Sequence, residues 1–176
     1  SAIKNNDKVG VILFTDKIEL FIPPKKGKKH VLKIIRELIN FKPTGKKTDI
    51  NQALSFIHNI LNKKAIIFLL SDFFDKNYQK SLNIISKKHD VVGLRIYDSF
   101  EKRVKNIGFS LFYDLEKETK YWIDTTSKKV LLEIERNYNE YVNYFQNSFL
   151  KSGANFIDIE VNESYTNKLL TFFKNR

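Results

Sequence analysis

Three short, mostly apolar runs constrain the fold of this chain more than any other feature. They are Val9–Phe14 (VGVILF), Ala65–Leu70 (AIIFLL) and Val91–Tyr97 (VVGLRIY). Continuous apolar runs of this length are typical of strands that are buried on both faces of a sheet. Segments with helical periodicity separate the runs. We therefore predict an α/β fold with a mostly parallel sheet and helices on both faces.

The covering helices are predicted from apolar residues at helical spacing. Asp49 suits the N-cap of one helix, and Gly153 suits the position just past the end of another. A last strand is expected at Phe156–Val161, and the expected helices are Val31–Phe41, Ile50–Leu61, a short helix around Leu82–Ile85, Val130–Leu150 and Tyr165–Phe173.

Two hairpins are predicted beside the parallel strands. Ile18–Ile22 alternates and follows a short turn, so it should pair with Val9–Phe14 and stop at Pro23, which cannot donate to a ladder. Phe109–Tyr113 and Tyr121–Ile123 flank a polar stretch. We expect these two strands to form a hairpin laid onto the main sheet.

Length and composition indicate one cytoplasmic domain over residues 1–176. The absence of cysteine excludes a disulfide scaffold and a thiolate metal site, and it is compatible with a reducing compartment. No apolar run approaches the about 20 residues that a membrane helix needs. Because the sequence contains no methionine, not even at its start, we expect that it begins mid-protein or has been trimmed.

The formal net charge of +11 has two interpretations. A basic surface can recruit a polyanion, so a basic nucleic-acid-binding α/β domain is the alternative function. The other interpretation is a composition rich in Lys, Asn, Ile and Phe, as AT-rich codons produce. We favour the second and expect no specific nucleic acid, because readers of bases use arginine. The only arginines are Arg36, Arg95, Arg103, Arg136 and Arg176.

Two polar pairs are predicted at the carboxyl ends of strands, where sites form in open α/β sheets. Thr48-Asp49 lies just before a helix, and Ser71-Asp72 directly follows AIIFLL. Together their oxygens suit a hard cation such as Mg²⁺. Two structural interpretations stay open: Thr48-Asp49 also fits an ordinary N-cap, and Ser71-Asp72 also fits a turn that ends the strand.

Signatures of catalysis are missing from the sequence. Gly45–Thr48 (GKKT) lacks the upstream glycine of a phosphate-binding loop, because position 40 is Asn40. The three histidines have no ligand spacing, and no Gly-x-Ser-x-Gly elbow occurs. A metal-dependent hydrolase at the Thr48/Asp72 edge lacks a recognisable general base. We therefore predict a binding protein and not an enzyme.

Several short segments occur in a distinctive order along nearly the whole chain. They are Asn6–Gly10 (NDKVG), Leu13–Asp16 (LFTD), Phe21–Pro24 (FIPP), Thr48–Ile50 (TDI), Leu70–Phe73 (LSDF), Lys88–Val92 (KHDVV), Trp122–Thr125 (WIDT) and Leu169–Phe173 (LLTFF). In this order they resemble the bacterial domain-of-unknown-function 58 family, whose members carry a von Willebrand factor A-like, Rossmann-like domain.

The resemblance implies a metal-ion-dependent adhesion site. Such a site combines an Asp-x-Ser-x-Ser loop, a threonine that Thr48 matches and an aspartate that Asp72 matches. The Asp-x-Ser-x-Ser loop is absent here and is expected upstream of Ser1, so Mg²⁺ or another divalent cation should bind the full-length protein and bind this fragment weakly or not at all. The family also implies an adaptor role with a MoxR-type AAA+ ATPase.

The resemblance further implies that this chain is the C-terminal portion of a longer protein and that the family's first strand is missing. That strand would lie between VGVILF and AIIFLL, so both would lose a neighbour and expose unpaired N–H and C=O groups. We expect the two strands to pair directly, or to pair with another copy of the chain, in preference to a split sheet. At the carboxyl edge, Thr48 and Asp72 should lie close together, largely exposed to a shallow cleft.

Overall fold

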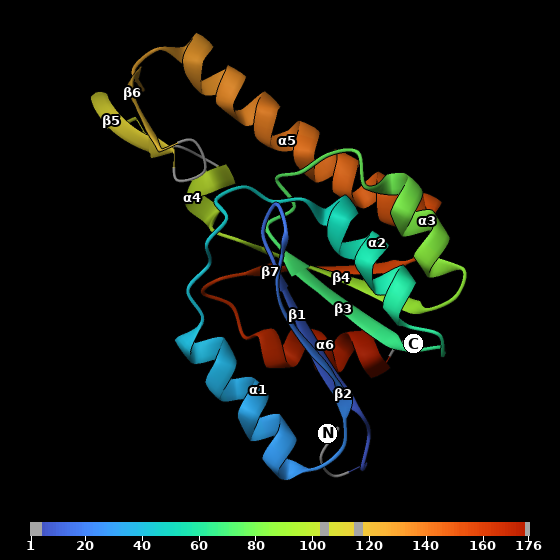
Figure 1. Cartoon of the computed structure of the whole chain (residues 1–176). Coiled ribbons are helices and arrows are strands. Elements are labelled where there is room, and N and C mark those ends of the chain that lie inside the picture. The colour runs from blue at the N-terminus through green and yellow to red at the C-terminus, as the bar shows by residue number, and fades with distance from the viewer. Residues whose placement is uncertain (1–4, 103–105, 115–117, 175–176) are drawn as a thin grey trace.

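A three-stranded parallel sheet forms the centre of the computed structural model, which describes residues 5–102, 106–114 and 118–174 (Figure 1). Its strands are β3 (Ile66–Ser71), β4 (Asp90–Tyr97) and β7 (Asn155–Glu160), in the order β3-β4-β7. The middle strand, β4, is buried from Val91 to Arg95. The predicted parallel pairing of AIIFLL with VVGLRIY is therefore confirmed.

Helices cover both faces of this sheet, as predicted. On one face, α2 (Ile50–Ile60), α3 (Gln79–Ser86) and α5 (Lys128–Lys151) enclose the larger core. On the other face, α6 (Tyr165–Lys174) packs against a smaller core built on Val92, Leu94 and Ile159. Alternate residues of β4 face opposite cores, which is why Val91 on one face and Val92 and Leu94 on the other are all apolar.

The ends of two helices follow the predictions from the sequence. Asp49 is the N-cap of α2, and its side chain accepts a hydrogen bond from the backbone N–H of Gln52 at 2.7 Å. Gly153 follows α5 with φ 64°, a left-handed conformation that glycine adopts without strain. Its N–H donates to the carbonyl of Leu150 at 3.1 Å.

The N-terminal hairpin pairs β1 (Val9–Phe14) with β2 (Ile18–Lys25), as predicted. The second strand runs on past Pro23 and Pro24, although the sequence predicts a stop there. In the described chain β2 has β1 as its one ladder partner, so the prolines lie in an edge strand, where a missing N–H is tolerated. A register shift between Val9 and Val11 accompanies this extension.

One prediction about the main sheet is wrong. Within the described residues β1 forms no ladder with β3, so VGVILF is not a hydrogen-bonded neighbour of AIIFLL and direct closure does not occur. The two strands still share a core, because Ile12 and Phe14 pack against the cluster that contains Ile67 and Leu69. One edge of β1 is paired with β2, and one edge of β3 is paired with β4. No described segment pairs with the other edge of either strand.

The second hairpin is confirmed as a pair but not in its position. Strands β5 (Phe109–Asp114) and β6 (Thr119–Asp124) pair antiparallel and form a separate two-stranded sheet. Figure 1 shows this hairpin beyond the start of α5, away from the parallel strands. The Thr125 hydroxyl donates to the Gly108 carbonyl at 2.7 Å and accepts from the Ile107 N–H at 2.9 Å. These bonds join the residue after β6 to the residues before β5 and close the hairpin at its open end.

The remaining helices are α1 (Lys28–Asn40), which matches the first predicted helix, and the short α4 (Ser99–Lys102), which was not predicted. None of the helices in the described ranges is long and apolar enough to cross a membrane.

Candidate functional site

Three loops meet at the carboxyl edge of the strands. One follows β1 at Thr15, one precedes α2, and one follows β3. The Asp49 N–H donates to the Thr15 carbonyl at 3.0 Å, and the Ile50 N–H donates to Asp75 Oδ2 at 2.8 Å. The loop that carries Thr48 is therefore hydrogen bonded to both of the others.

Glu19, which no sequence motif marks, holds the first two loops together. Glu19 Oε1 accepts from the Thr15 hydroxyl at 2.9 Å, the Thr44 N–H at 3.1 Å and the Gly45 N–H at 2.6 Å. These bonds, led by that from Gly45, lower the pKa of Glu19 from 4.5 to about 2. The ionised Glu19 side chain therefore hydrogen bonds β2 to the loop before α2.

Gly45 is required by the closeness of this contact. A Cβ atom at this position would lie 2.1 Å from Thr15 Oγ1 and 2.2 Å from Asp16 Oδ1. The glycine in the GKKT segment therefore lets the loop approach the end of β1, a role unrelated to phosphate binding.

Asp72 lies at the surface in a turn that ends β3. Its Oδ1 accepts from the Phe74 N–H at 3.2 Å and from the Ser71 hydroxyl at 3.3 Å. Phe73 between them has φ 61°, and its buried ring lies 4.3 Å from the ring of Phe145. The turn is therefore fixed by a core aromatic residue, while the Asp72 carboxylate remains exposed.

Thr48 lies in the adjoining loop and is half-buried, so the prediction that it is largely exposed is wrong. Its neighbour Asp49 caps α2, so the N-cap interpretation of this pair is correct for Asp49. Neither Thr48 nor Asp72 lines either of the two cavities identified on the described surface. That the two side chains approach each other closely stays a prediction.

Carboxylates are concentrated at this edge, but most of them have structural partners. Asp75 is half-buried and accepts from the N–H groups of Ile50 and Lys76. Burial raises the pKa of Asp75, and these two hydrogen bonds oppose the rise. No group of three or more His, Asp or Glu side chains in the described ranges is arranged to hold a metal ion. Oxygen donors suited to Mg²⁺ are present at Thr48, Ser71 and Asp72, without a complete ligand shell.

The three histidines lie apart from this edge and from any shared ligand set. His30 Nε2 is hydrogen bonded to the Val9 carbonyl at 2.9 Å and joins α1 to β1. His58 belongs to α2, and His89 is buried just before β4.

A family model described as "Protein of unknown function DUF58" matches residues 1–143. The chain belongs to this family.

Two solved structures share the fold of this DUF58 chain. One is an aerotolerance-related membrane protein from Bacteroides fragilis with multiple mutations to serines, at 14% identity and a TM-score of 0.55. The other is the conserved hypothetical protein BatB from Bacteroides thetaiotaomicron, at 11% identity and a TM-score of 0.54. Each alignment covers 97% of the DUF58 chain and 78% of the solved one. No curated protein matches.

Proposed function

We propose that this DUF58 protein is a protein-interaction module with a von Willebrand factor A-like fold, and that its Thr48–Asp72 edge forms part of a divalent-cation site. The hydrogen bond from the Ile50 N–H to Asp75 is the observation that best supports the proposal. It fixes the loop that bears Thr48 against the loop that bears Asp72. This contact supports the proposal that the Thr48 hydroxyl and the Asp72 carboxylate act together at one edge of the sheet.

The chemistry of these donors is that of a hard-cation site. Mg²⁺ takes oxygen ligands and retains waters, so a partner's carboxylate can replace a water and complete the contact. Thr48 would supply a hydroxyl and Asp72 a carboxylate. The other ligands would come from the Asp-x-Ser-x-Ser element that the family resemblance assigns to the full-length protein. This chain by itself should then bind the cation weakly.

The partner that we propose is a MoxR-type AAA+ ATPase, for which this module acts as an adaptor in the cytoplasm. We propose binding and not catalysis, because the other carboxylates at the edge serve to hold loops. Glu19, Asp49 and Asp75 each accept hydrogen bonds from backbone N–H groups. A carboxylate engaged in this way is a poor general base.

The decisive experiment measures Mg²⁺ binding by calorimetry, and capture of the ATPase with and without EDTA, using the full-length protein. Asp72→Asn should abolish both cation binding and Mg²⁺-dependent capture. Asp124→Asn is the matched control, because Asp124 is also exposed and its Oδ1 also accepts from an N–H two residues later, at 2.9 Å from Thr126. Unchanged Mg²⁺ affinity in Asp72→Asn would show that Asp72 is not a ligand.

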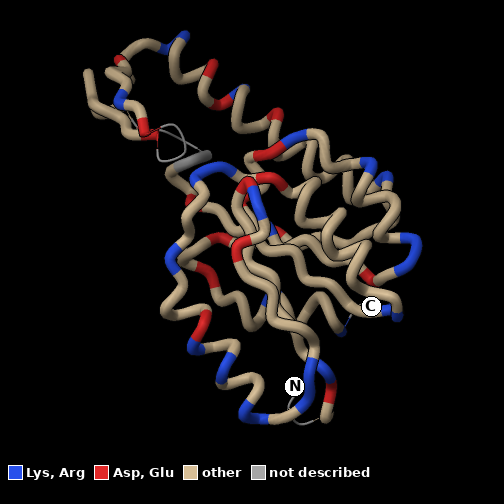
Figure 2. Tube along the Cα trace, in the orientation of Figure 1, with Lys and Arg blue, Asp and Glu red and all other residues tan. Residues whose placement is uncertain are grey.

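The distribution of charge does not favour a nucleic-acid interface. Figure 2 shows Lys and Arg spread along the trace, on α1, on the loops around α3 and at the start of α5. Phosphate contacts need a continuous basic surface, and non-specific duplex binding at physiological salt is typically about 10⁻⁴–10⁻⁶ M. We expect a gel-shift titration at physiological salt to show no sub-micromolar duplex binding. Tighter binding would favour the nucleic-acid alternative.

A further inference from the structure

One face of the β5–β6 hairpin carries only exposed side chains. Residues that lie opposite each other on paired antiparallel strands share a face. On this face the pairs are Phe109 with Asp124, Leu111 with Trp122, and Tyr113 with Lys120. All six residues are exposed. Figure 1 shows the hairpin projecting beyond the start of α5. We call these six residues the hairpin face.

The centre of the hairpin face is apolar. Its four apolar side chains, Phe109, Leu111, Tyr113 and Trp122, are 67%, 47%, 51% and 63% exposed. At roughly 150–250 Å² for a large side chain, they expose about 450 Å² together. The rings of Phe109 and Trp122 stack at 5.1 Å with their planes 7° apart. A patch of this size often marks an interaction site, and a two-stranded hairpin without further packing is only marginally stable in water.

Hydrogen bonds and an ion pair hold the hairpin at both of its ends. At the open end, the Thr125 hydroxyl bonds to Gly108 and Ile107. At the other end, the Lys46 ammonium lies 2.6 Å from Glu118 Oε2, which joins the residue before β6 to the loop before α2. The hairpin face is therefore formed in advance, and a partner can dock on it without first ordering the strands.

The order of residues along the two strands makes the hairpin face complementary to itself. Strand β6 carries Lys120 and Asp124 on either side of Trp122, and β5 carries an aromatic ring on either side of Leu111. A two-fold axis that crosses the strands at Leu111 and Trp122 would bring Lys120 onto the partner's Asp124. The same axis would set the aromatic rings of β5 against those of the partner. Such reciprocal contacts are the property of a two-fold symmetric interface.

Charge and area both favour a second copy as the occupant. The Asp124 carboxylate stays ionised, because hydrogen bonds from the Thr126 hydroxyl and N–H lower its pKa. An anionic lipid surface would repel this carboxylate, whereas the partner's Lys120 would neutralise it. Two copies of the face would bury about 900 Å² of apolar side chains, and the charged residues raise the total to about 1,000 Å². That area is the lower limit of a specific interface and indicates a weak dimer.

We propose that the hairpin face binds a second copy of this chain, face to face and with the strands of the two copies antiparallel. The aromatic residues and Leu111 form the apolar centre of the contact. Because the contact is symmetric, the ion pair between Lys120 and the partner's Asp124 occurs twice, once at each end. An apolar centre with a polar rim is the usual organisation of a protein interface.

The fluorescence of Trp122 tests the contact directly, because Trp122 is the only tryptophan of the chain. We expect its emission to move to shorter wavelength, and its quenching by acrylamide to fall, as the concentration rises through about 10⁻⁴ M, the affinity of a small transient interface. Analytical ultracentrifugation should show a dimer over the same range. Association through the open edge of β3 would leave Trp122 exposed and its emission unchanged.

Substitution of the charged residues tests the two-fold arrangement. Lys120→Glu should weaken the dimer by about tenfold, because the substitution replaces both ion pairs by pairs of like charge. Lys120→Glu/Asp124→Lys should restore the wild-type affinity, since the exchange keeps opposite charges in contact.

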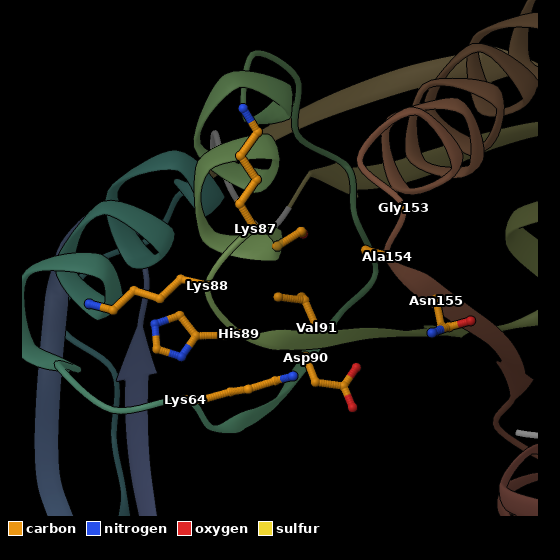
Figure 3. Close-up of a pocket in the computed structure, with 10 residues that line it drawn as sticks. Lys64, Lys87, Lys88, His89, Asp90, Val91, Gly153, Ala154 and Asn155 are labelled. Atoms are coloured by element: carbon orange, nitrogen blue, oxygen red, sulfur yellow. The ribbon is translucent and has the colours of Figure 1, made fainter.

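Lys64→Glu is the matched control for Lys120→Glu. Lys64 is also exposed, and Figure 3 shows it beside Lys88 and Asp90 at the amino edge of the parallel sheet, away from the hairpin. The chain carries a net charge of +11, so a Lys→Glu change outside the contact lowers the repulsion between two copies. Lys64→Glu should therefore leave the dimer unchanged or slightly tighter.

A further variant does not depend on the ion pairs. Leu111→Lys would set two ammonium groups against each other on the two-fold axis and should abolish the dimer. Trp122 emission that does not change with concentration, or equal effects of Lys120→Glu and Lys64→Glu, would overturn the proposal. Emission that shifts only when phosphatidylglycerol vesicles are added would also overturn it, and would assign the face to a lipid surface.

Mg²⁺ binding is a separate measurement from dimerisation. Asp124→Asn remains a control for Mg²⁺ binding, because Asp124 lies at the open end of the hairpin, away from the Lys46–Glu118 contact with the loop before α2.

Discussion

The Ile50 backbone N–H donates to Asp75 Oδ2 at 2.8 Å, which joins the first turn of α2 to the loop after β3. Ile50 is completely buried, so its N–H would lose its partner if the carboxylate were removed. A buried donor left unsatisfied costs about 1–3 kcal/mol. We expect Asp75→Ala to lower the free energy of unfolding by that amount, measured by urea denaturation.

Asp75→Asn is the control for this prediction, because its amide oxygen can still accept from Ile50. Burial raises the pKa of Asp75 above its ordinary 3.8, so the folded state keeps the proton to a higher pH than the unfolded state does. Wild-type stability should therefore fall, relative to Asp75→Asn, as pH rises from about 3.8 through the raised value. If Asp75→Asn were as destabilised as Asp75→Ala, the hydrogen bond would not explain the effect.

Glu19 gives the opposite dependence on pH. Its pKa falls from 4.5 to about 2 in the folded state, so its contribution is complete above the unfolded value and is lost as pH falls toward 2. We expect wild type to unfold at higher urea than Glu19→Gln at pH 7, and this difference to shrink on acidification. NMR titration of the carboxyl carbon measures the pKa directly. A Glu19 pKa near 4.5 would show that these hydrogen bonds do not stabilise the ionised side chain.

Gly93 lies in the middle of the sheet against the ring of Phe149. A Cβ at position 93 would lie 2.5 Å from Phe149 Cζ and 2.6 Å from Cε1. Overpacking of this kind costs about 1–3 kcal/mol, which we expect for Gly93→Ala in chemical denaturation. In a Phe149→Leu background the same substitution should cost less, because the ring atoms are gone. Equal costs in both backgrounds would exclude the steric explanation.

Local patterns predicted the elements of this fold well. Val9–Phe14 and Ala65–Leu70 are strands to within one residue. The expected burial on both faces is wrong, because no residue of β1 is fully buried and Ile66, Phe68 and Leu70 are exposed on one face of β3. The N-cap at Asp49 and the glycine at 153 were likewise visible, because capping depends on residues close in the sequence. Burial of Arg95 in β4 could not be predicted, since its carboxylate partner, Asp158, lies on β7.

The arrangement of the site depended on contacts that local patterns do not reveal. Glu19 lies in an alternating strand and resembles any solvent-facing residue, yet its partner Gly45 is 26 residues away. Asp75 likewise acts on a helix that begins 25 residues earlier. The position of the β5–β6 hairpin was wrong for the same reason, because pairing within a hairpin does not specify what the hairpin packs against.

The edge of β3 that faces away from β4 is open in the described chain. Ile66 and Leu70 are 60% and 54% exposed on one face of this strand, and its edge away from β4 has no ladder in the described ranges. An apolar strand with an open edge is a template for pairing with another chain. We therefore expect this chain to self-associate with rising concentration in analytical ultracentrifugation. Ile66→Lys/Leu70→Lys should reduce the association, because charged side chains on an edge strand oppose pairing.

Leu132→Lys is the matched control for that experiment, because Leu132 is 65% exposed on α5, away from the strand edge. Leu132→Lys should leave the self-association unchanged if strand pairing causes the association. The substitution should reduce the association if general apolar contact is the cause. Hydrogen exchange adds a second readout, since pairing should protect the β3 amides as concentration rises. A chain that stayed monomeric at high concentration, with β3 amides exchanging freely, would show that the open edge is tolerated without a partner.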